Sequence, residues 1–136
     1  MRFLGIDYGT KRIGLALSDE GGRFASPYLV LPAADQSIIA KIKSICEKEG
    51  VEKIIIGESR DFKGRPNPVM KKIVKFRERL AAVTTLPLDY EPEFLTSSEA
   101  RRLPEGGEGE MIKDGLLDAR AAALILKSYI DRTNNQ

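Results

Sequence analysis

The sequence predicts a single α/β domain over residues 1–136, built on a mixed five-stranded sheet with helices on both faces. Two observations support this fold class. Three short apolar segments joined by tight turns open the chain, which predicts an antiparallel three-stranded meander. Segments with helical spacing then alternate with further short apolar segments, which predicts crossover helices and parallel strands. A length of 136 residues suits one such domain.

The meander is predicted from residues 2–7, 12–18 and 24–31. These segments are apolar, and the turns between them contain Gly9 and the pair Gly21–Gly22. Pro27 lies within the third segment. Because proline cannot donate a hydrogen bond to a sheet ladder, it predicts an edge strand or a bulge there.

The remaining elements alternate. Asp35 or Ser37 can cap a helix that ends at Gly50, and residues 51–57 contain an isoleucine run typical of a strand covered on both faces. A helix over about 68–83 follows, then a strand over about 86–90. A short helix over about 96–103 and a helix over about 114–130 complete the order. The buried stripe expected for the helix over 68–83 comprises Val69, Ile73, Phe76, Leu80 and Val83.

Composition restricts the chemistry that this chain can perform. It has no histidine and one cysteine, Cys46. This excludes Ser-His-Asp and Cys-His catalysis, an internal disulfide and most zinc sites. Cys46 lies among isoleucines at helical spacing, so we expect a buried core thiol. No stretch approaches the ~20 apolar residues of a membrane span, and we expect a soluble cytoplasmic protein.

Charge is unevenly distributed, although the net charge is only +2. Residues 60–79 contain eight basic side chains and two acidic ones, whereas residues 89–110 contain seven acidic and two basic ones. A basic surface beside an acidic cluster suits a protein that binds phosphates and cations. An ordinary solvated helix face followed by an acidic loop would have the same composition.

Two carboxylates stand in unusual surroundings. Asp7 ends an apolar strand, where open α/β sheets place ligand-binding groups, although it could equally stabilise its own turn. Asp118 lies in an apolar, alanine-rich helix, where a carboxylate usually needs a cation, although a first-turn acid can also serve the helix dipole. Glu93 and Glu58 each sit at a strand's carboxyl end, and geometry alone does not choose between them.

Three segments of the chain resemble the YqgF (RuvX) family. They are residues 7–16 (DYGTKRIGLA), 93–100 (EFLTSSEA) and 117–123 (LDARAAA), in the family's order and with similar spacing. The resemblance spans nearly the whole chain. The second segment departs from the family pattern, because Pro92 and Phe94 replace an Asp and an Arg beside Glu93. The glutamate itself is retained, which favours Glu93 over Glu58.

The resemblance implies a ribonuclease H-like fold and a nuclease that processes the 5′ end of pre-16S rRNA, or a Holliday junction resolvase acting on four-way DNA. It implies that Asp7, Glu93 and Asp118 are the catalytic acids. Carboxylates alone can support phosphodiester hydrolysis if they hold Mg²⁺ or Mn²⁺, and two such ions about 3.5–4 Å apart are expected here. Asp114 is one turn before Asp118 and can assist, although capping also explains it.

Basic and hydroxyl side chains are expected to contact the nucleic acid. Those in the first turn are Thr10, Lys11 and Arg12; those further out are Arg60, Lys63, Arg65, Lys71, Lys75 and Arg79. The last three follow at four-residue steps and so form one ridge on their helix. Symmetric cutting of a junction calls for a two-fold dimer, whereas rRNA trimming does not, so monomer and homodimer both remain open.

Two readings from other classes also fit. The Asp-x-Gly-Thr segment at residues 7–10 occurs in the phosphate-binding half of actin-like and Hsp70-like ATPases, but those proteins need two such domains. A non-catalytic nucleic-acid-binding module would keep the fold without the activity.

Overall fold

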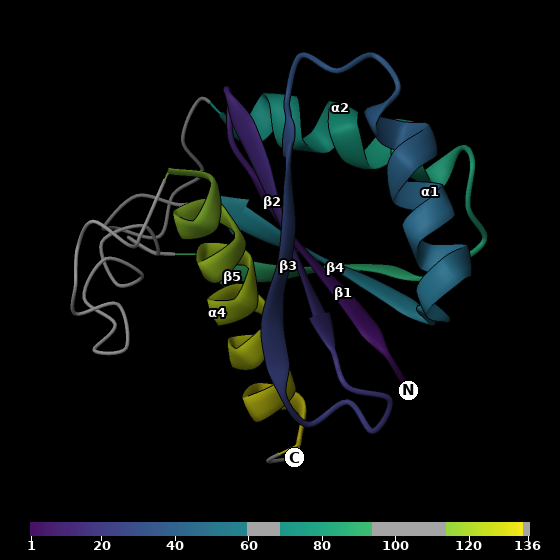
Figure 1. The fold of residues 1–136 in the computed structure, drawn as a ribbon, viewed down its shortest axis with the longest axis vertical. Coiled ribbons are helices and arrows are strands. Elements are labelled where there is room, and N and C mark those ends of the chain that lie inside the picture. The colour runs from purple at the N-terminus through teal and green to yellow at the C-terminus, as the bar shows by residue number, and fades with distance from the viewer. Residues whose placement is uncertain (60–68, 94–113, 135–136) are drawn as a thin grey trace.

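The computed structural model describes residues 1–59, 69–93 and 114–134 (Figure 1). Its elements follow the predicted order. They are β1 (Phe3–Tyr8), β2 (Arg12–Ser18), β3 (Ala25–Pro32), α1 (Ile38–Glu49), β4 (Lys53–Ser59), α2 (Met70–Ala81), β5 (Leu88–Glu93) and α4 (Asp114–Asn134). The short helix predicted over 96–103 lies outside the described residues.

The five strands form one mixed sheet in the order β3-β2-β1-β4-β5. β1 pairs antiparallel with β2, and β2 with β3, whereas β4 runs parallel to both β1 and β5. The predicted meander and crossovers are therefore confirmed. Pro27 is confirmed at both features that it predicted, because β3 is the edge strand and the β2–β3 register shifts between Leu15 and Ala16.

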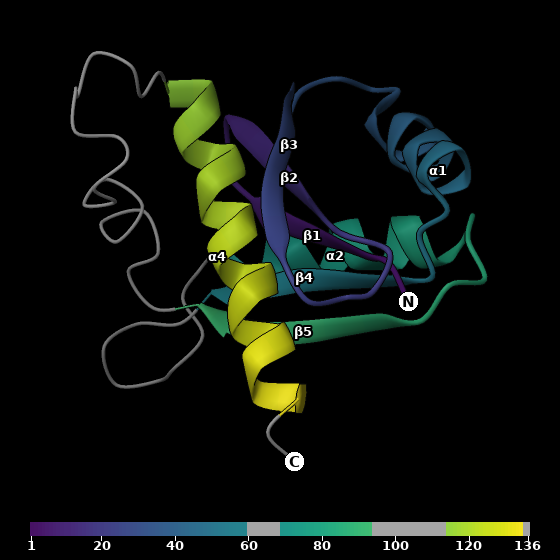
Figure 2. The same cartoon turned by 60° about the horizontal axis from the view of Figure 1, so that its bottom comes forward.

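Helices cover both faces of the sheet (Figures 1 and 2). α1 and α2 lie on one face, where they pack on Leu4, Ile6 and their neighbours. α4 lies on the other, over a smaller cluster that includes Ala16 and Ile55. Since successive strand residues point to opposite faces, every second residue of β1 faces α4. Asp7 belongs to the α4 side by this alternation.

Glycines let α4 approach the sheet closely. A Cβ added to Gly5 would lie 2.9 Å from Cβ of Leu126 and 3.0 Å from the carbonyl oxygen of Ala122. A Cβ added to Gly14 would collide with the backbone carbonyl of Asp118. The buried alanines Ala119, Ala121 and Ala122 complete this small-residue contact. α4 therefore crosses β1 and β2 at backbone contact distance.

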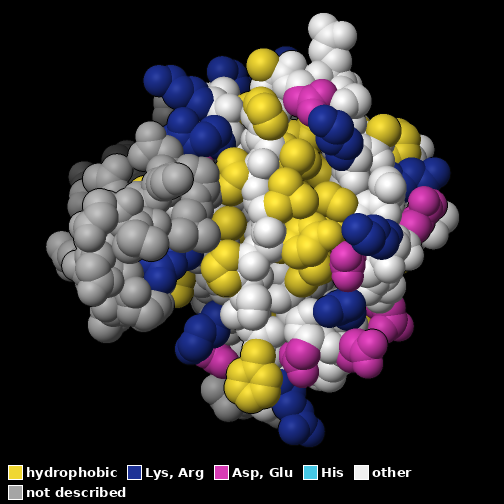
Figure 3. Space-filling model, viewed as in Figure 1, with side chains coloured by type: hydrophobic (Ala, Val, Ile, Leu, Met, Phe, Trp, Pro, Cys, Tyr) yellow, Lys and Arg dark blue, Asp and Glu magenta, His cyan; other side chains and the backbone are white. Residues whose placement is uncertain are grey.

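The edge of the meander is less covered than its centre. Figure 3 shows a band of apolar side chains on the face where β3 is nearest the viewer. Residues 28–30 of β3 are only half-buried, as their position on the edge strand allows. None of the helices in the described part of the chain is long and apolar enough to cross a membrane.

Several predicted details were wrong. Val83 was expected in the buried stripe but is 39% exposed, because α2 ends at Ala81 before reaching it. Ser37 is the N-cap residue of α1, one of the two that were predicted, but its side chain makes no capping hydrogen bond. Asp35 instead accepts hydrogen bonds from the amide and hydroxyl of Ser37, which closes the turn before the helix. β4 continues to Ser59 and β5 to Glu93, so Glu58 and Glu93 lie within strands rather than after them.

Candidate functional site

Asp7 lies near the carboxyl end of β1, on the face that α4 covers. It stands opposite Gly14 of β2 in the antiparallel ladder. Only 8% of Asp7 is exposed, so its carboxylate lies in one of the most covered positions that an acid occupies in this fold. Burying a carboxylate is costly unless neighbouring groups compensate its charge. The position therefore suits a functional acid better than a solvated turn residue.

Gly14 brings Asp118 to the same place. The Asp118 carbonyl rests against the Cα of Gly14, and Gly14 is the ladder partner of Asp7. The backbones of two acids that are far apart in the sequence therefore both lie next to one glycine. The side chain of Asp118 is 21% exposed. This juxtaposition of Asp7 and Asp118 is the central feature of the candidate site.

Arg12 forms an ion pair with Asp118. Its Nε donates a hydrogen bond of 2.6 Å to Oδ2 of Asp118, and the Arg12 side chain is 41% exposed. Arg12 lies two residues before Gly14 on β2, so it belongs to the same face of the sheet. The structure thus pairs a predicted metal ligand with a predicted phosphate contact. A guanidinium at this point offsets part of the charge that two neighbouring carboxylates would otherwise bring together.

Strand alternation places Glu58 and position 93, the two candidates for the third catalytic acid, on opposite faces of the sheet. Glu93 pairs with Ser59 in the ladder and has the same parity as Asp89 and Glu91, whose side chains contact α4. Glu58 has the opposite parity and faces the α1–α2 side. Burial raises the pKa of Tyr90 on that side, and the charge of Glu58 raises it further. The backbone register therefore puts position 93, rather than Glu58, on the face of Asp7 and Asp118.

The side chains of Glu93 and Asp114 lie outside the described part of the structure, so their participation stays a prediction. Among the side chains that are described, no three Asp, Glu or Cys residues gather closely enough to hold a metal ion. The donor set nevertheless suits a hard cation. Asp7 and Asp118 both supply carboxylate oxygen, which is the ligand that Mg²⁺ and Mn²⁺ prefer.

The predicted nucleic-acid contacts are partly located. Thr10 and Lys11 are exposed in the β1–β2 turn, and Figure 3 shows basic side chains gathered at that end of the molecule. Lys71, Lys75 and Arg79 are exposed on α2, as the ridge prediction required. Arg60, Lys63 and Arg65 lie outside the described residues. The sequence analysis did not include Lys72, which lines a groove together with Lys75 and Arg79. Lys72 precedes these residues by three and seven positions, a spacing that places all three on one side of a helix and could have identified it.

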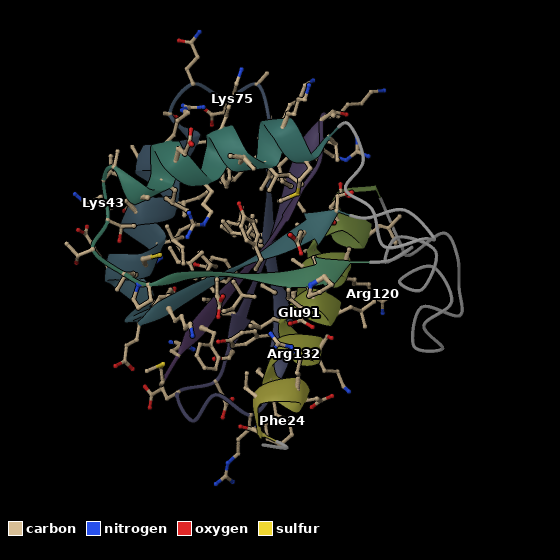
Figure 4. The ribbon with its side chains drawn as sticks, turned by 180° about the vertical axis from the view of Figure 1, so that it is seen from behind. Phe24, Lys43, Lys75, Glu91, Arg120 and Arg132 are labelled. Carbon is tan, nitrogen blue, oxygen red and sulfur yellow. The ribbon has the colours of Figure 1, made fainter. Side chains whose placement is uncertain are left out.

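A second missed feature is a polar network that ties α4 to β5. Glu91 is 4% exposed and accepts hydrogen bonds from Ser128 at 2.7 Å and from two guanidinium nitrogens of Arg132 at 2.8 and 3.0 Å (Figure 4). Nearby, Tyr129 donates to Asp89 and accepts from Lys53. These bonds fix α4 relative to β5, the strand that ends at Glu93. The only sign of this network in the sequence was that acids occupy alternate positions of the strand, at Asp89 and Glu91.

Comparison with known proteins supports one family. A family model described as "RuvX: Holliday junction resolvase" matches residues 1–132. A protein of Syntrophus aciditrophicus named "Putative pre-16S rRNA nuclease" is 37% identical, over 100% of this chain and 92% of its own length. A protein of the same name from Chlorobium phaeobacteroides is 38% identical, over 98% of this chain and 94% of its own.

Solved structures share the fold at lower identity. Thermus thermophilus RuvC in complex with Holliday junction substrate aligns with a TM-score of 0.58 and 17% identity, covering 98% of this chain and 96% of that one. The fowlpox virus Holliday junction resolvase aligns with a TM-score of 0.53 and 14% identity, covering 97% of this chain and 99% of that one. These alignments confirm the ribonuclease H-like fold.

Proposed function

The chain belongs to the RuvX family, and from this premise we propose that it hydrolyses a phosphodiester bond at the 5′ end of pre-16S rRNA, using Asp7, Glu93 and Asp118. That it is a nuclease follows from the family and from the full-length similarity to the two nucleases described above. The observation that carries the proposed site is that the backbones of Asp7 and Asp118 both adjoin Gly14.

In the proposed site the three acids together bind divalent cations. Asp7 contributes from the covered end of β1, Asp118 from the helix that crosses it, and Glu93 from the end of β5. A bound Mg²⁺ or Mn²⁺ pair would supply charge stabilisation to the phosphate and lower the pKa of an attacking water. Each acid is placed by a rigid strand or helix, which suits the geometric demands of such a site.

Arg12 orients Asp118 in this proposal. Its hydrogen bond to Oδ2 fixes one oxygen of the carboxylate while the Asp118 backbone is fixed against Gly14. A two-point hold of this kind reduces the conformational freedom that the carboxylate would lose on binding a cation. Arg12 is also close to the exposed Thr10 and Lys11, so the same turn is suited to receive the phosphate that is cut.

Basic residues beyond the turn would hold the rest of the nucleic acid. Each phosphate neutralised by a lysine or arginine releases counterions, which favours binding at low salt. The candidates are Lys71, Lys75 and Arg79 on α2, with Arg60, Lys63 and Arg65 before it. Precursor rRNA as substrate places the reaction in the cytoplasm, with the single domain over 1–136 acting as a monomer or a homodimer.

A second candidate substrate is four-way DNA. The description of the matching family model favours it. Both substrates use the same carboxylates, so they differ in what the surrounding surface binds and in whether two active sites must act together.

The deciding experiment compares cleavage of precursor 16S rRNA and of a four-way DNA junction in Mg²⁺, in Mn²⁺ and in chelator. We expect the RNA to be cut near its 5′ end with either cation and not in chelator. Asp7→Asn should abolish cutting, whereas Asp131→Asn, an exposed acid at the far end of α4, should not. Cutting by Asp7→Asn at the normal rate would refute the site, and cutting of DNA alone would refute the substrate. If the unmodified chain cuts nothing, it is a binding module.

A further inference from the structure

A groove of about 250 Å³ lies at the carboxyl end of β1, on the opposite side of the sheet from Asp7. Tyr8 and Ile13 contribute from the β1–β2 hairpin, Ala33 and Ile38 from the turn into α1, and α2 closes the other side. The backbone amide of Ala33 donates to the Lys11 carbonyl at 3.0 Å, so the turn of the hairpin is tied to the groove's rim. The groove is therefore continuous with the turn that precedes the candidate site.

Its lining combines cations with an aromatic floor. Lys72, Lys75 and Arg79 line it from α2, and all three side chains are exposed. No ion pair in the described part of the chain uses these three cations. The floor contains Tyr8, whose ring packs against Phe76 with centroids 5.2 Å apart. Figure 4 shows Lys75 projecting from the outer side of α2.

This combination fits a nucleotide better than a simple anion or an apolar ligand. Three cations satisfy a phosphate, and an aromatic ring beside apolar side chains accepts the flat surface of a base. The groove, at about 250 Å³, has room for one nucleotide at most rather than for several. Bases inside a duplex are stacked on one another and do not present a free face to an aromatic ring, so the groove favours an unpaired nucleotide.

The groove and the acids lie on opposite faces of the sheet, both at the carboxyl end of the central strand β1. Asp7 and Tyr8 are neighbours in β1, so their side chains point to opposite faces. Only the turn at residues 9–11, in which Thr10 and Lys11 are exposed, separates the two sides along the chain. A strand held in the groove and cut at Asp7 must therefore pass over this turn. A single strand can bend so sharply, whereas a duplex resists bending.

We propose that this groove binds a nucleotide of the substrate strand a few residues from the phosphate that is cut, and that the enzyme thereby selects single-stranded nucleic acid. The proposal rests on the proposed function for the identity of the strand, but the groove itself can be tested without cleavage. It assigns a binding role to Lys72 and Tyr8, which the sequence did not single out.

The test measures binding of a fluorescent single-stranded RNA oligonucleotide by anisotropy, without divalent cations, so that no cutting occurs. The double variant Lys72→Ala/Arg79→Ala should lose about tenfold in affinity, and the slope of log affinity against log salt should fall by about 1.4, or about 0.7 for each cation. Tyr8→Leu keeps an apolar side chain but removes the aromatic ring, and it should lose about fivefold or more. Lys43→Ala, an exposed lysine on α1, is the matched control and should bind normally.

The outcomes separate this proposal from the proposed function. If the double variant binds like Lys43→Ala, the groove is not a nucleic-acid site. If adenosine monophosphate binds as tightly as the oligonucleotide, or a duplex binds as tightly as the single strand, the substrate-strand assignment is wrong. If the unmodified chain cuts no nucleic acid but the double variant still loses tenfold in binding, the groove stands and the proposed hydrolysis fails.

Discussion

Replacing Gly14 by alanine tests whether the contact between β2 and α4 sets the position of Asp118. The added Cβ would collide with the Asp118 carbonyl, which is backbone and cannot turn away as a side chain can. Overpacking of this kind usually costs about 1–3 kcal/mol, and a rigid opposing group favours the upper end. Alanine restricts the unfolded chain and returns about 0.4–1 kcal/mol. We therefore expect a net loss of about 2 kcal/mol in the free energy of unfolding.

That loss corresponds to a melting temperature lower by about 7 °C for a chain of this size, which leaves the protein folded at 25 °C. α4 must move to relieve the collision, and Asp118 moves with it. Since a displacement of about 1 Å in a catalytic group can cost about 100-fold in rate, kcat/KM for RNA cleavage should fall by about that factor. Unfolding in urea and a cleavage assay on the same preparation measure both quantities.

Gly5→Ala is the matched control for this substitution. Its Cβ would approach Leu126 and Ala122 at 2.9 and 3.0 Å, a milder overlap than the collision with the Asp118 carbonyl at Gly14, so it should destabilise the protein less. Leu126 is eight residues, about 12 Å, beyond Asp118, and Ala122 is about one helical turn beyond it, so the rate should fall less than in Gly14→Ala. Equal loss of rate in the two variants would refute the reasoning, as would an unchanged rate for Gly14→Ala.

Three further predictions concern other parts of the molecule. Glu91→Gln removes the charge that binds Arg132, so a buried hydrogen bond between charged groups is weakened. The free energy of unfolding, measured in urea, should fall by about 1–3 kcal/mol. An unchanged unfolding midpoint would argue against the network. Burial raises the pKa of the Cys46 thiol to about 11, so the native protein should not react with iodoacetamide at pH 8, and rapid alkylation without denaturant would contradict this. Hydrogen bonds from Lys41 and Ser37 lower the pKa of Asp35 to about 2. The contribution of the Asp35 carboxylate to stability is therefore present above pH 4 and is lost as the pH falls toward 2. An NMR titration of Asp35 should show a midpoint near pH 2, and a midpoint near pH 4 would contradict the prediction.

The fold could be predicted from the sequence because its signals are local. The apolar run at Ile54–Ile56 is covered on both faces, and Pro27 marks both the edge strand and the register shift. Element ends were less predictable. Strand ends at Ser59 and Glu93 are set by pairing between β4 and β5, and such pairing partners cannot be read from either segment alone.

The candidate site was predictable only in its acids. Their surroundings marked Asp7 and Asp118 as candidates and the family resemblance implied their catalytic role, which stays a prediction; the glycine next to both backbones was not identified. Gly14 was visible only as part of a family motif, and its contact with the Asp118 backbone depends on how α4 crosses the sheet. The ion pair between Arg12 and Asp118 was unpredictable for the same reason, since 106 residues separate its partners.

Strand alternation at the end of β1 connects the proposed site with the proposed groove. Asp7 faces α4, which brings a second acid; Tyr8 faces α2, which brings three cations. The acid pair repels a nucleic-acid backbone, and cations are needed to attract that backbone. Because the sheet separates the α2 cations from the acids, the cations do not pair with the acids and stay available to the backbone. Arg12 is the exception, since it lies on the acids' own face and is already paired with Asp118. If the proposed site and groove are both correct, this division would explain how an enzyme with a net charge of only +2 binds a polyanion and gathers carboxylates where the polyanion is cut.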